Sequence, residues 1–280
     1  MQTMIVGLPP DPDSAPAVLQ AAGAAGLAVD VAPYYCAGKA LSLVARQLAE
    51  SGGLAVTTRV PRRDVRPDAP VTDAYPAGWI LRSVRRQLAE TTLPRFCTVL
   101  LERWLPSWEL DTVLPELREV TATGLADQAG IALTDSDPGA LWPARDAVSG
   151  LWLEGDGSLV SDDFLANWAP GYRESGAITQ ARAPYFHGWL CSDTRSAQSY
   201  GGQPRGALFR SVEEALVARR TEMSAVARQL GTDLPVLALA FVRSRLGPDG
   251  RVVVGCRTPE QLARTSSWWQ QAEVVARRLR

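Results

Sequence analysis

Short apolar runs alternate with longer amphipathic stretches along the whole chain. Runs of strand length that are rich in aliphatic and β-branched residues, separated by segments of helical period, are typical of βαβ units and a parallel sheet. The pattern predicts strands at residues 4–8, 27–31, 54–59, 96–103, 130–134, 147–153, 176–182 and 252–255. It predicts main helices at residues 14–26, 38–51, 76–90, 107–124, 138–145, 161–174, 212–230 and 259–279, with one more at 234–246.

Eight strands that alternate with eight main helices favour a closed α/β barrel, the (β/α)8 or TIM barrel, over an open sheet. A length of 280 residues suits one such barrel, so we expect a single domain over residues 1–280. Two long polar loops, at residues 60–75 and 192–205, follow the third and seventh predicted strands. In a barrel of this type, both would lie on the face that carries the chemistry.

Charge and hydropathy exclude several classes of partner. A net charge of −1 gives no electrostatic reason to expect nucleic acid or an acidic membrane surface. With 46% hydrophobic residues, the composition is that of an ordinary globular protein, and no apolar run approaches the roughly 20 residues of a membrane span. The first residues lack the pattern of a secretory signal. We therefore expect a cytoplasmic protein with a small-molecule substrate and no membrane or nucleic-acid partner.

The residues that support metal and proton chemistry are few. Lys39 is the one lysine among 29 basic residues, and His187 is the one histidine. The four cysteines are widely spaced and form no CxxC pair, so we expect buried, reduced thiols. Three of them follow predicted strands, but a metal site is disfavoured because histidine support is almost absent.

Five short motifs occur in order at the ends of the predicted strands. They are 29–35 (Val-Asp-Val-Ala-Pro-Tyr-Tyr), 57–60 (Thr-Thr-Arg-Val), 99–104 (Val-Leu-Leu-Glu-Arg-Trp), 184–190 (Pro-Tyr-Phe-His-Gly-Trp-Leu) and 254–262 (Val-Gly-Cys-Arg-Thr-Pro-Glu-Gln-Leu). Each is weak alone, but together they cover nearly the whole chain. In this order the sequence resembles the aldo-keto reductases.

The resemblance implies a hydride transfer from NADPH to a carbonyl. In that family a tyrosine acts as general acid beside a lysine–aspartate pair, and a histidine helps to orient the carbonyl. Asp30 and Tyr35 match this pattern, whereas the lysine is replaced by Arg59 and the histidine by Arg103.

The positions that the resemblance assigns to the nicotinamide are also altered. The serine and asparagine after the fifth strand fall in 130–133, and the glutamine of the sixth strand has no counterpart in 148–151. The stacking aromatic falls at Arg182, and the asparagine that meets adenine falls at Thr265. The phosphate clamp is retained in Gly255, Arg257 and Gln261, which belong to the motif at 254–262. The sequence thus favours no cofactor, with NADPH possible.

Several of these residues have two interpretations. Arg59 can pair with Asp30 and lower the pKa of Tyr35, or form a purely structural pair. Arg103 can contact an anionic ligand or form a salt bridge, with Glu102 pointing into the barrel or pairing with it.

The candidate substrate-binding residues are Trp104, Trp152, His187, Arg182 and Trp189. The three tryptophans follow or end strands and can line an aromatic pocket or pack in the core. His187 can act as acid or base, or be structural.

Three functions follow. The first is an enzyme repurposed for a redox-neutral acid–base step on a small anionic or carbonyl metabolite: an isomerisation, elimination, cyclisation or aldol-type reaction. In it, Tyr35 is the acid or base, Asp30 orients Arg59, and Arg59 with Arg103 stabilises negative charge. By analogy with other reused folds, it would serve bacterial specialised metabolism. The second is an NADPH-dependent carbonyl reductase with a rearranged tetrad, and the third is a non-catalytic binding or scaffold protein.

Overall fold

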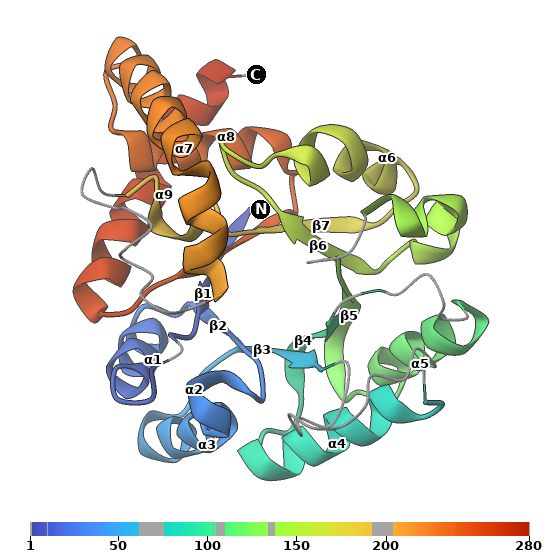
Figure 1. Ribbon diagram of the computed structural model, residues 1–280. Coiled ribbons are helices and arrows are strands. Elements are labelled where there is room, and N and C mark those ends of the chain that lie inside the picture. The colour runs from blue at the N-terminus through green and yellow to red at the C-terminus, as the bar shows by residue number, and fades with distance from the viewer. Residues whose placement is uncertain are drawn as a thin grey trace.

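The computed structural model describes residues 2–9, 11–61, 76–102, 104, 110–133, 138–191 and 204–279, without the side chains of 140 and 204–210. Its centre is a closed barrel of parallel strands in chain order, in which the last strand pairs with the first (Figure 1). The strands are β1 (Thr3–Gly7), β2 (Ala28–Val31), β3 (Val56–Val60), β4 (Phe96–Glu102), β5 (Ala126–Ala132), β6 (Trp152–Asp156), β7 (Ile178–Arg182) and β8 (Arg251–Gly255). The predicted (β/α)8 barrel is confirmed.

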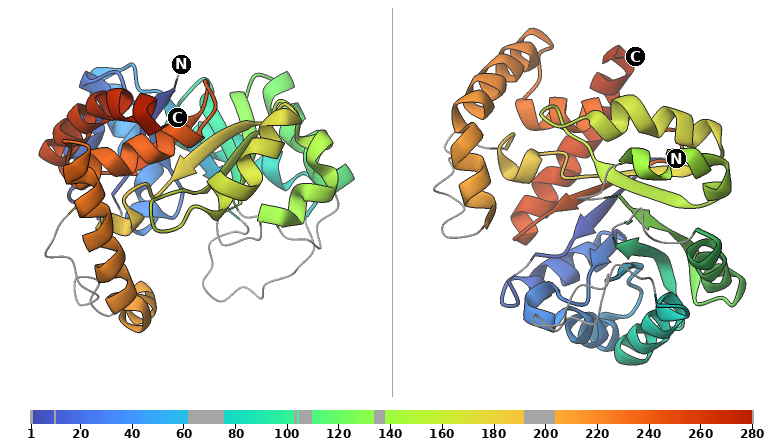
Figure 2. Two further views of the ribbon diagram at one scale, coloured as in Figure 1. Left: turned by 90° about the horizontal axis from the view of Figure 1, so that it is seen from above. Right: turned by 45° about the vertical axis from the view of Figure 1, so that its right-hand side comes forward.

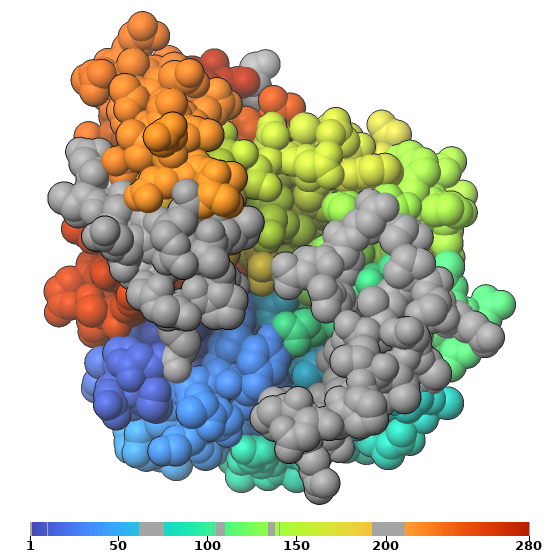
Figure 3. All heavy atoms as spheres, viewed as in Figure 1, coloured from blue at the N-terminus to red at the C-terminus, as the bar shows by residue number. Residues whose placement is uncertain are grey.

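Helices surround this barrel (Figure 1). They are α1 (Ala15–Ala24), α2 (Tyr35–Gly38), α3 (Ala40–Ser51), α4 (Trp79–Thr91), α5 (Leu110–Ala122), η1 (Pro138–Val148), η2 (Phe164–Trp168), α6 (Ala169–Glu174), η3 (Phe186–Gly188), α7 (Pro204–Gln229), α8 (Leu234–Arg245) and α9 (Pro259–Leu279). The long helix α7 stands out from the body of the molecule in both views of Figure 2 and forms the orange projection of Figure 3.

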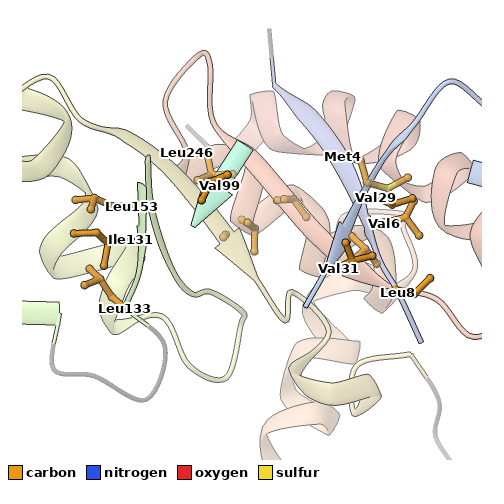
Figure 4. Close-up of a cluster of buried hydrophobic side chains, with 14 of the residues drawn as sticks. Met4, Val6, Leu8, Val29, Val31, Val99, Ile131, Leu133, Leu153 and Leu246 are labelled. Carbon is orange, nitrogen blue, oxygen red and sulfur yellow. The ribbon is translucent and has the colours of Figure 1, made fainter. Parts of the chain in front are cut away.

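The main hydrophobic core lies between the strands and the surrounding helices. Because side chains alternate across a strand, every second strand residue faces the helices. Met4 and Val6 of β1, and Val29 and Val31 of β2, are buried in this layer (Figure 4). The apolar strand residues recognised in the sequence therefore pack against the helices, and the residues that alternate with them line the interior of the barrel.

The interior of the barrel is unusually polar. Near the N-terminal ends of the strands, the Arg251 guanidinium stacks on the Trp152 ring at 3.9 Å from the ring centroid. The same group donates to Thr98 Oγ1 at 2.8 Å and to Gln128 Oε1 at 2.6 Å. These contacts join four strands and form a floor beneath the residues at the strand ends.

Two strand predictions were wrong in their bounds. The sixth strand was expected at 147–153 but runs from Trp152 to Asp156, because residues up to Val148 continue the helical segment η1. Charged residues and glycine are uncommon in buried strands, so the sequence of β6 gives little signal for a strand. Gly155 is needed there because a Cβ would lie 2.2 Å from the Phe164 ring. The fifth strand also starts earlier than expected, at Ala126.

No single helix among the described residues is long and apolar enough to cross a bilayer. The pair formed by 211–229 of α7 and α8 passes that test only jointly, across a bend of 87°.

Candidate active site

The Arg59 guanidinium forms the centre of a buried ionic cluster near the C-terminal ends of the strands. Its Nη1 donates to Glu154 Oε1 at 2.7 Å, and its Nη2 donates to Glu154 Oε2 at 2.9 Å. Nη2 also donates to Asp30 Oδ2 at 2.7 Å. Gln180 completes the cluster by donating from Nε2 to Glu154 Oε2 at 2.6 Å. Arg59 and Asp30 are each 2% exposed, so both side chains are almost fully buried.

The end of β3 is held in place by α4, which fixes the base of the Arg59 side chain. Gln87 Nε2 donates to the Arg59 carbonyl oxygen at 3.0 Å, and Thr58 Oγ1 donates to Gln87 Oε1 at 2.5 Å. Both side chains are fully buried. A buried polar network whose members are satisfied is rigid, so Arg59 is presented to Asp30 and Glu154 from a fixed strand.

Tyr35 lies beside this cluster, at the start of the short helix α2. The two residues after it, Cys36 and Ala37, have φ of 55° and 54°, a left-handed conformation that costs energy for residues other than glycine. The Tyr35 ring packs edge-on against Tyr34 at 5.2 Å between centroids, and the Tyr34 hydroxyl donates to Glu102 Oε1.

Arg59 acts to lower the pKa of Tyr35, as expected, but it does not decide the net shift. Burial and the neighbouring Asp30 outweigh Arg59, and Glu154 adds to their effect, so the pKa of Tyr35 rises to about 12. The physical reason is that Arg59 is already neutralised by the two carboxyl groups. Tyr35 therefore keeps its proton across the whole physiological range.

A pocket of about 370 Å³ opens above the cluster and reaches the first turns of α9. From the sequence prediction it is lined by Asp30, Tyr35, Arg59, Arg182, His187, Gly255, Arg257 and Gln261. Residues that sequence reasoning did not assign also line it, among them Tyr185, Cys191, Cys256, Arg264 and Trp268. Eight predicted residues from different parts of the chain thus meet in one cavity.

Two of these predicted residues come from β7 and the loop after it. Arg182 is fixed by Asp156 of the adjacent strand, with its Nε donating to Oδ1 at 2.5 Å. His187 has a φ of 57°, and Ala183 and Phe186 also have positive φ, so this loop holds a strained backbone against the pocket.

The three predicted tryptophans lie elsewhere. Trp104, Trp152 and Trp189 are each at most 2% exposed and are not among the residues that line this pocket. Trp152 lies on the barrel floor against Arg251, Trp104 belongs to the main core, and Trp189 packs with Leu216. Of the two interpretations, the structure favours packing in the interior over lining of this pocket for all three tryptophans. Arg103 lies outside the described residues.

Glu154 is the main site residue that the sequence prediction missed, because the sixth strand was placed too early. Inward-facing residues alternate along a strand, so the sequence Trp152-Leu153-Glu154-Gly155-Asp156 could have identified Glu154 and Asp156 as neighbours across one face. No glutamine occupies these positions in the corrected strand either.

Metal and disulfide chemistry find no support in the part of the chain that the structure describes. All four cysteines are free thiols, and no group of His, Cys, Asp or Glu side chains has the arrangement of a metal site. Burial raises the pKa of Cys256 to about 11, so this pocket thiol is not a reactive thiolate at neutral pH.

Fold and site together define a (β/α)8 barrel with an aspartate, a tyrosine and a guanidinium at the C-terminal ends of its strands, where such barrels carry their chemistry. The chain belongs to the Aldo/keto reductase family, whose family model matches residues 3–274. Among solved structures it is similar to the glycerol dehydrogenase AKR11B4 from Gluconobacter oxydans, with a TM-score of 0.72 and 17% identity. The match covers 98% of this chain and 91% of that one. No curated protein matches the sequence.

The family generally uses NADP(H), and the pocket fits one part of that molecule better than the other. Arg257 and Arg264 bring positive charge, and a Cβ at Gly255 would meet nothing within 4 Å, which leaves room for a phosphate. At the positions that the resemblance assigns to the nicotinamide, Arg182 lines the pocket with a charged side chain. β5 ends at buried Ala132 and is followed by buried Leu133, whose side chains have no donor or acceptor.

Proposed function

We propose that this protein catalyses a redox-neutral acid–base step on a small molecule that bears a carbonyl and an anionic group. The observation that carries the proposal is the contrast between Arg59 and Arg182. Both terminal nitrogens of Arg59 are engaged by carboxyl groups, whereas Arg182, which contacts Asp156 through Nε, is 21% exposed and lines the pocket. Arg59 thus serves as a counter-ion, and Arg182 takes the stabilisation of negative charge that we had expected of Arg59 with Arg103.

Tyr35 is suited to polarise a carbonyl. A hydroxyl that keeps its proton donates a hydrogen bond, and a donor placed where charge develops on oxygen stabilises an enolate-like transition state. Arg182 lines the same pocket and would hold a carboxylate or phosphate of the substrate. Isomerisation, elimination, cyclisation and aldol-type reactions that begin by proton removal next to a carbonyl all pass through such a state.

The test is proton exchange in deuterium oxide, followed by proton NMR without any nucleotide. A panel of small 2-oxo acids and hydroxyketones, offered with and without a phosphate group, covers the proposed chemistry. We expect loss of the signal of the hydrogen next to the carbonyl for at least one compound, and a drop of about 10²–10⁴-fold in that rate in Tyr35→Phe. Arg182→Gln should raise KM for anionic compounds more than it lowers kcat. Exchange no faster than in buffer for every compound would contradict the proposal.

A second candidate, an NADPH-dependent carbonyl reductase, is favoured by one observation: the pocket is continuous from Asp30 and Tyr35 to Arg257 and Arg264. It is tested by NADPH titration with thermal unfolding as readout. A ligand at about 100 times its Kd stabilises the fold by roughly 2.7 kcal/mol. Saturable binding together with NADPH oxidation by simple aldehydes would establish the reductase. A binding or scaffold protein would instead tolerate Tyr35→Phe and keep its partner.

A further inference from the structure

Two buried carboxyl groups share one guanidinium inside the barrel. Arg59 contacts both oxygens of Glu154 and one oxygen of Asp30, and all three side chains are at most 3% exposed. Removing a second negative charge from water without a second cation is costly, and two carboxylates at one site raise the pKa of one of them. One of these two groups is therefore expected to keep its proton.

The other groups that face Asp30 do not supply the missing charge. Arg182, from β7, is engaged by Asp156 at 2.5 Å and so brings its own counter-ion. Tyr35, from α2, is a neutral phenol, and Gly7 of the neighbouring β1 carries no side chain. The balance between the two carboxyl groups thus depends on how each is hydrogen-bonded.

Glu154 is the better hydrogen-bonded of the two. It accepts from both terminal nitrogens of Arg59 and from Gln180, whereas Asp30 accepts only through Oδ2. Asp30 lines the pocket, and its Oδ1 is a buried atom that no donor among the described residues reaches. The pKa directions agree. At Asp30, burial, with a contribution from Glu154, outweighs Arg59 and Arg182 and raises the pKa. At Glu154, Arg59, with Arg182 and Gln180, outweighs burial and lowers the pKa.

We propose that Asp30 is the proton-carrying group of this site and exchanges its proton with a substrate in the pocket, while Tyr35 remains protonated. This inference rests on the proposed function and assigns its central role to a different residue. Asp30 was expected only to orient Arg59.

The step balances without an oxidant or reductant. In molecules in which Asp30 has released its proton to solvent, its carboxylate takes a proton from the carbon next to the substrate carbonyl. The electron pair of that C–H bond forms a C=C bond, and the C=O pair moves to oxygen, where the Tyr35 hydroxyl donates a hydrogen bond. Asp30 then returns the proton to carbon, at the same or another position. A carboxyl group whose pKa is raised is a stronger base than an ordinary aspartate once it ionises.

The first experiment compares the free energy of unfolding of wild type and Asp30→Asn across pH. If Asp30 keeps its proton in the fold, its folded pKa lies above the unfolded value of about 3.9. The stability of wild type relative to Asp30→Asn is then greatest below that value and falls as pH rises through the folded pKa. If Asp30 is instead an ionised counter-ion, wild type gains on the variant as pH rises. The sign of the change with pH in the stability difference between wild type and Asp30→Asn decides between the two. A difference that grows as pH rises would overturn the inference.

Infrared spectra of substrate-free protein give an independent readout. We expect the C=O band of a protonated carboxylic acid at a pH where free aspartate is ionised, and we expect Asp30→Asn to remove it. Glu154→Gln is the partner variant: it removes the second carboxyl group that shares Arg59, so we expect the pKa of Asp30 to fall and the band to weaken. A band that survives in Asp30→Asn, or failure of Asp30→Asn to fold while Glu154→Gln folds, would overturn the inference.

Both readouts are independent of turnover, so the two proposals fail separately. A protonated Asp30 without proton exchange on any compound would reject the proposed function alone. Exchange that is lost in Tyr35→Phe but persists in Asp30→Asn would reject this inference alone. If both proposals hold, we expect Asp30→Asn to lower the exchange rate by about 10²–10⁴-fold.

Discussion

Arg59 and Glu154 form a two-point ion pair across the interior of the barrel, with N–O distances of 2.7 and 2.9 Å between β3 and β6. Neither side chain is more than 2% exposed. A planar guanidinium matches a carboxylate in this way, whereas a lysine ammonium at the same place would act as a single point charge. The pair links strands that are far apart in sequence and fixes the guanidinium that Asp30 also contacts.

We expect Glu154→Gln to lower the free energy of unfolding by about 3–5 kcal/mol, because it leaves part of a buried charge pair uncompensated. Urea unfolding measures this directly. The control is Asp127→Asn, which removes the exposed pair of Asp127 with Arg95, whose side chains are 49% and 61% exposed. Such a pair contributes about 0.2–1 kcal/mol. Equal losses in the two variants would contradict the structural role of Glu154.

The sequence predicts the barrel well because its outer layer obeys a simple pattern. Apolar residues such as Val29 and Val31 recur at every second position along strands that are buried beneath helices. This period of two can be recognised in a short stretch of sequence. The inner layer is harder to predict. Glu154 lies in a strand that reads as polar and glycine-rich, and only its partner across the barrel explains why a charge is buried there.

The candidate site could be predicted only in part for the same reason. Motif order brought Asp30, Tyr35 and Arg182 to one face, and the structure places all three in one pocket. Whether Arg59 is available to a substrate depends on a contact with Glu154, 95 residues away, which no local pattern reveals. Likewise, the motifs place Arg59 beside Tyr35 but do not reveal the burial that raises the pKa of this tyrosine.

The titration of Tyr35 gives a second prediction. Its pKa of about 12 in the fold lies above the usual value of about 10, so its ionisation opposes folding. The stability that depends on its proton is present below about pH 10 and is lost as pH rises through about 12. Subtracting the ultraviolet tyrosinate titration of Tyr35→Phe from that of wild type isolates this group. A difference curve with its midpoint at or below pH 10 would show that Arg59 still activates the phenol.

Gly130 offers a test of packing in the barrel wall. A Cβ at this residue would lie 2.0 Å from the Trp152 carbonyl oxygen, a backbone atom that cannot rotate away. We expect Gly130→Ala to destabilise the fold by about 1–3 kcal/mol or more. Gly23 of α1 is the matched control, because its nearest neighbour would be a Leu54 methyl at 3.8 Å. Gly23→Ala should stabilise the helix by roughly 0.5–1 kcal/mol. The two changes are chemically identical, so opposite signs in thermal unfolding would locate the cause in the contact with β6.

Glu116 of α5 provides the last prediction, because it caps a neighbouring helix rather than its own. Its carboxylate accepts from the backbone N–H of Gly78 and, at 3.1 Å, from that of Ile80, at the start of α4. A negative charge is favoured at a helix N-terminus, and the first N–H groups of a helix have no partner within it. Glutamine keeps one acceptor oxygen but loses the charge, so Glu116→Gln should cost about 1–2 kcal/mol in urea unfolding. Glu119→Gln, an exposed change on the same helix, should stay within about 0.5 kcal/mol of wild type. A loss in Glu116→Gln no larger than that of its control would mean that α4 is held by its apolar face alone. In that case the position of Gln87, and with it the end of β3 beneath Arg59, would not depend on the cap.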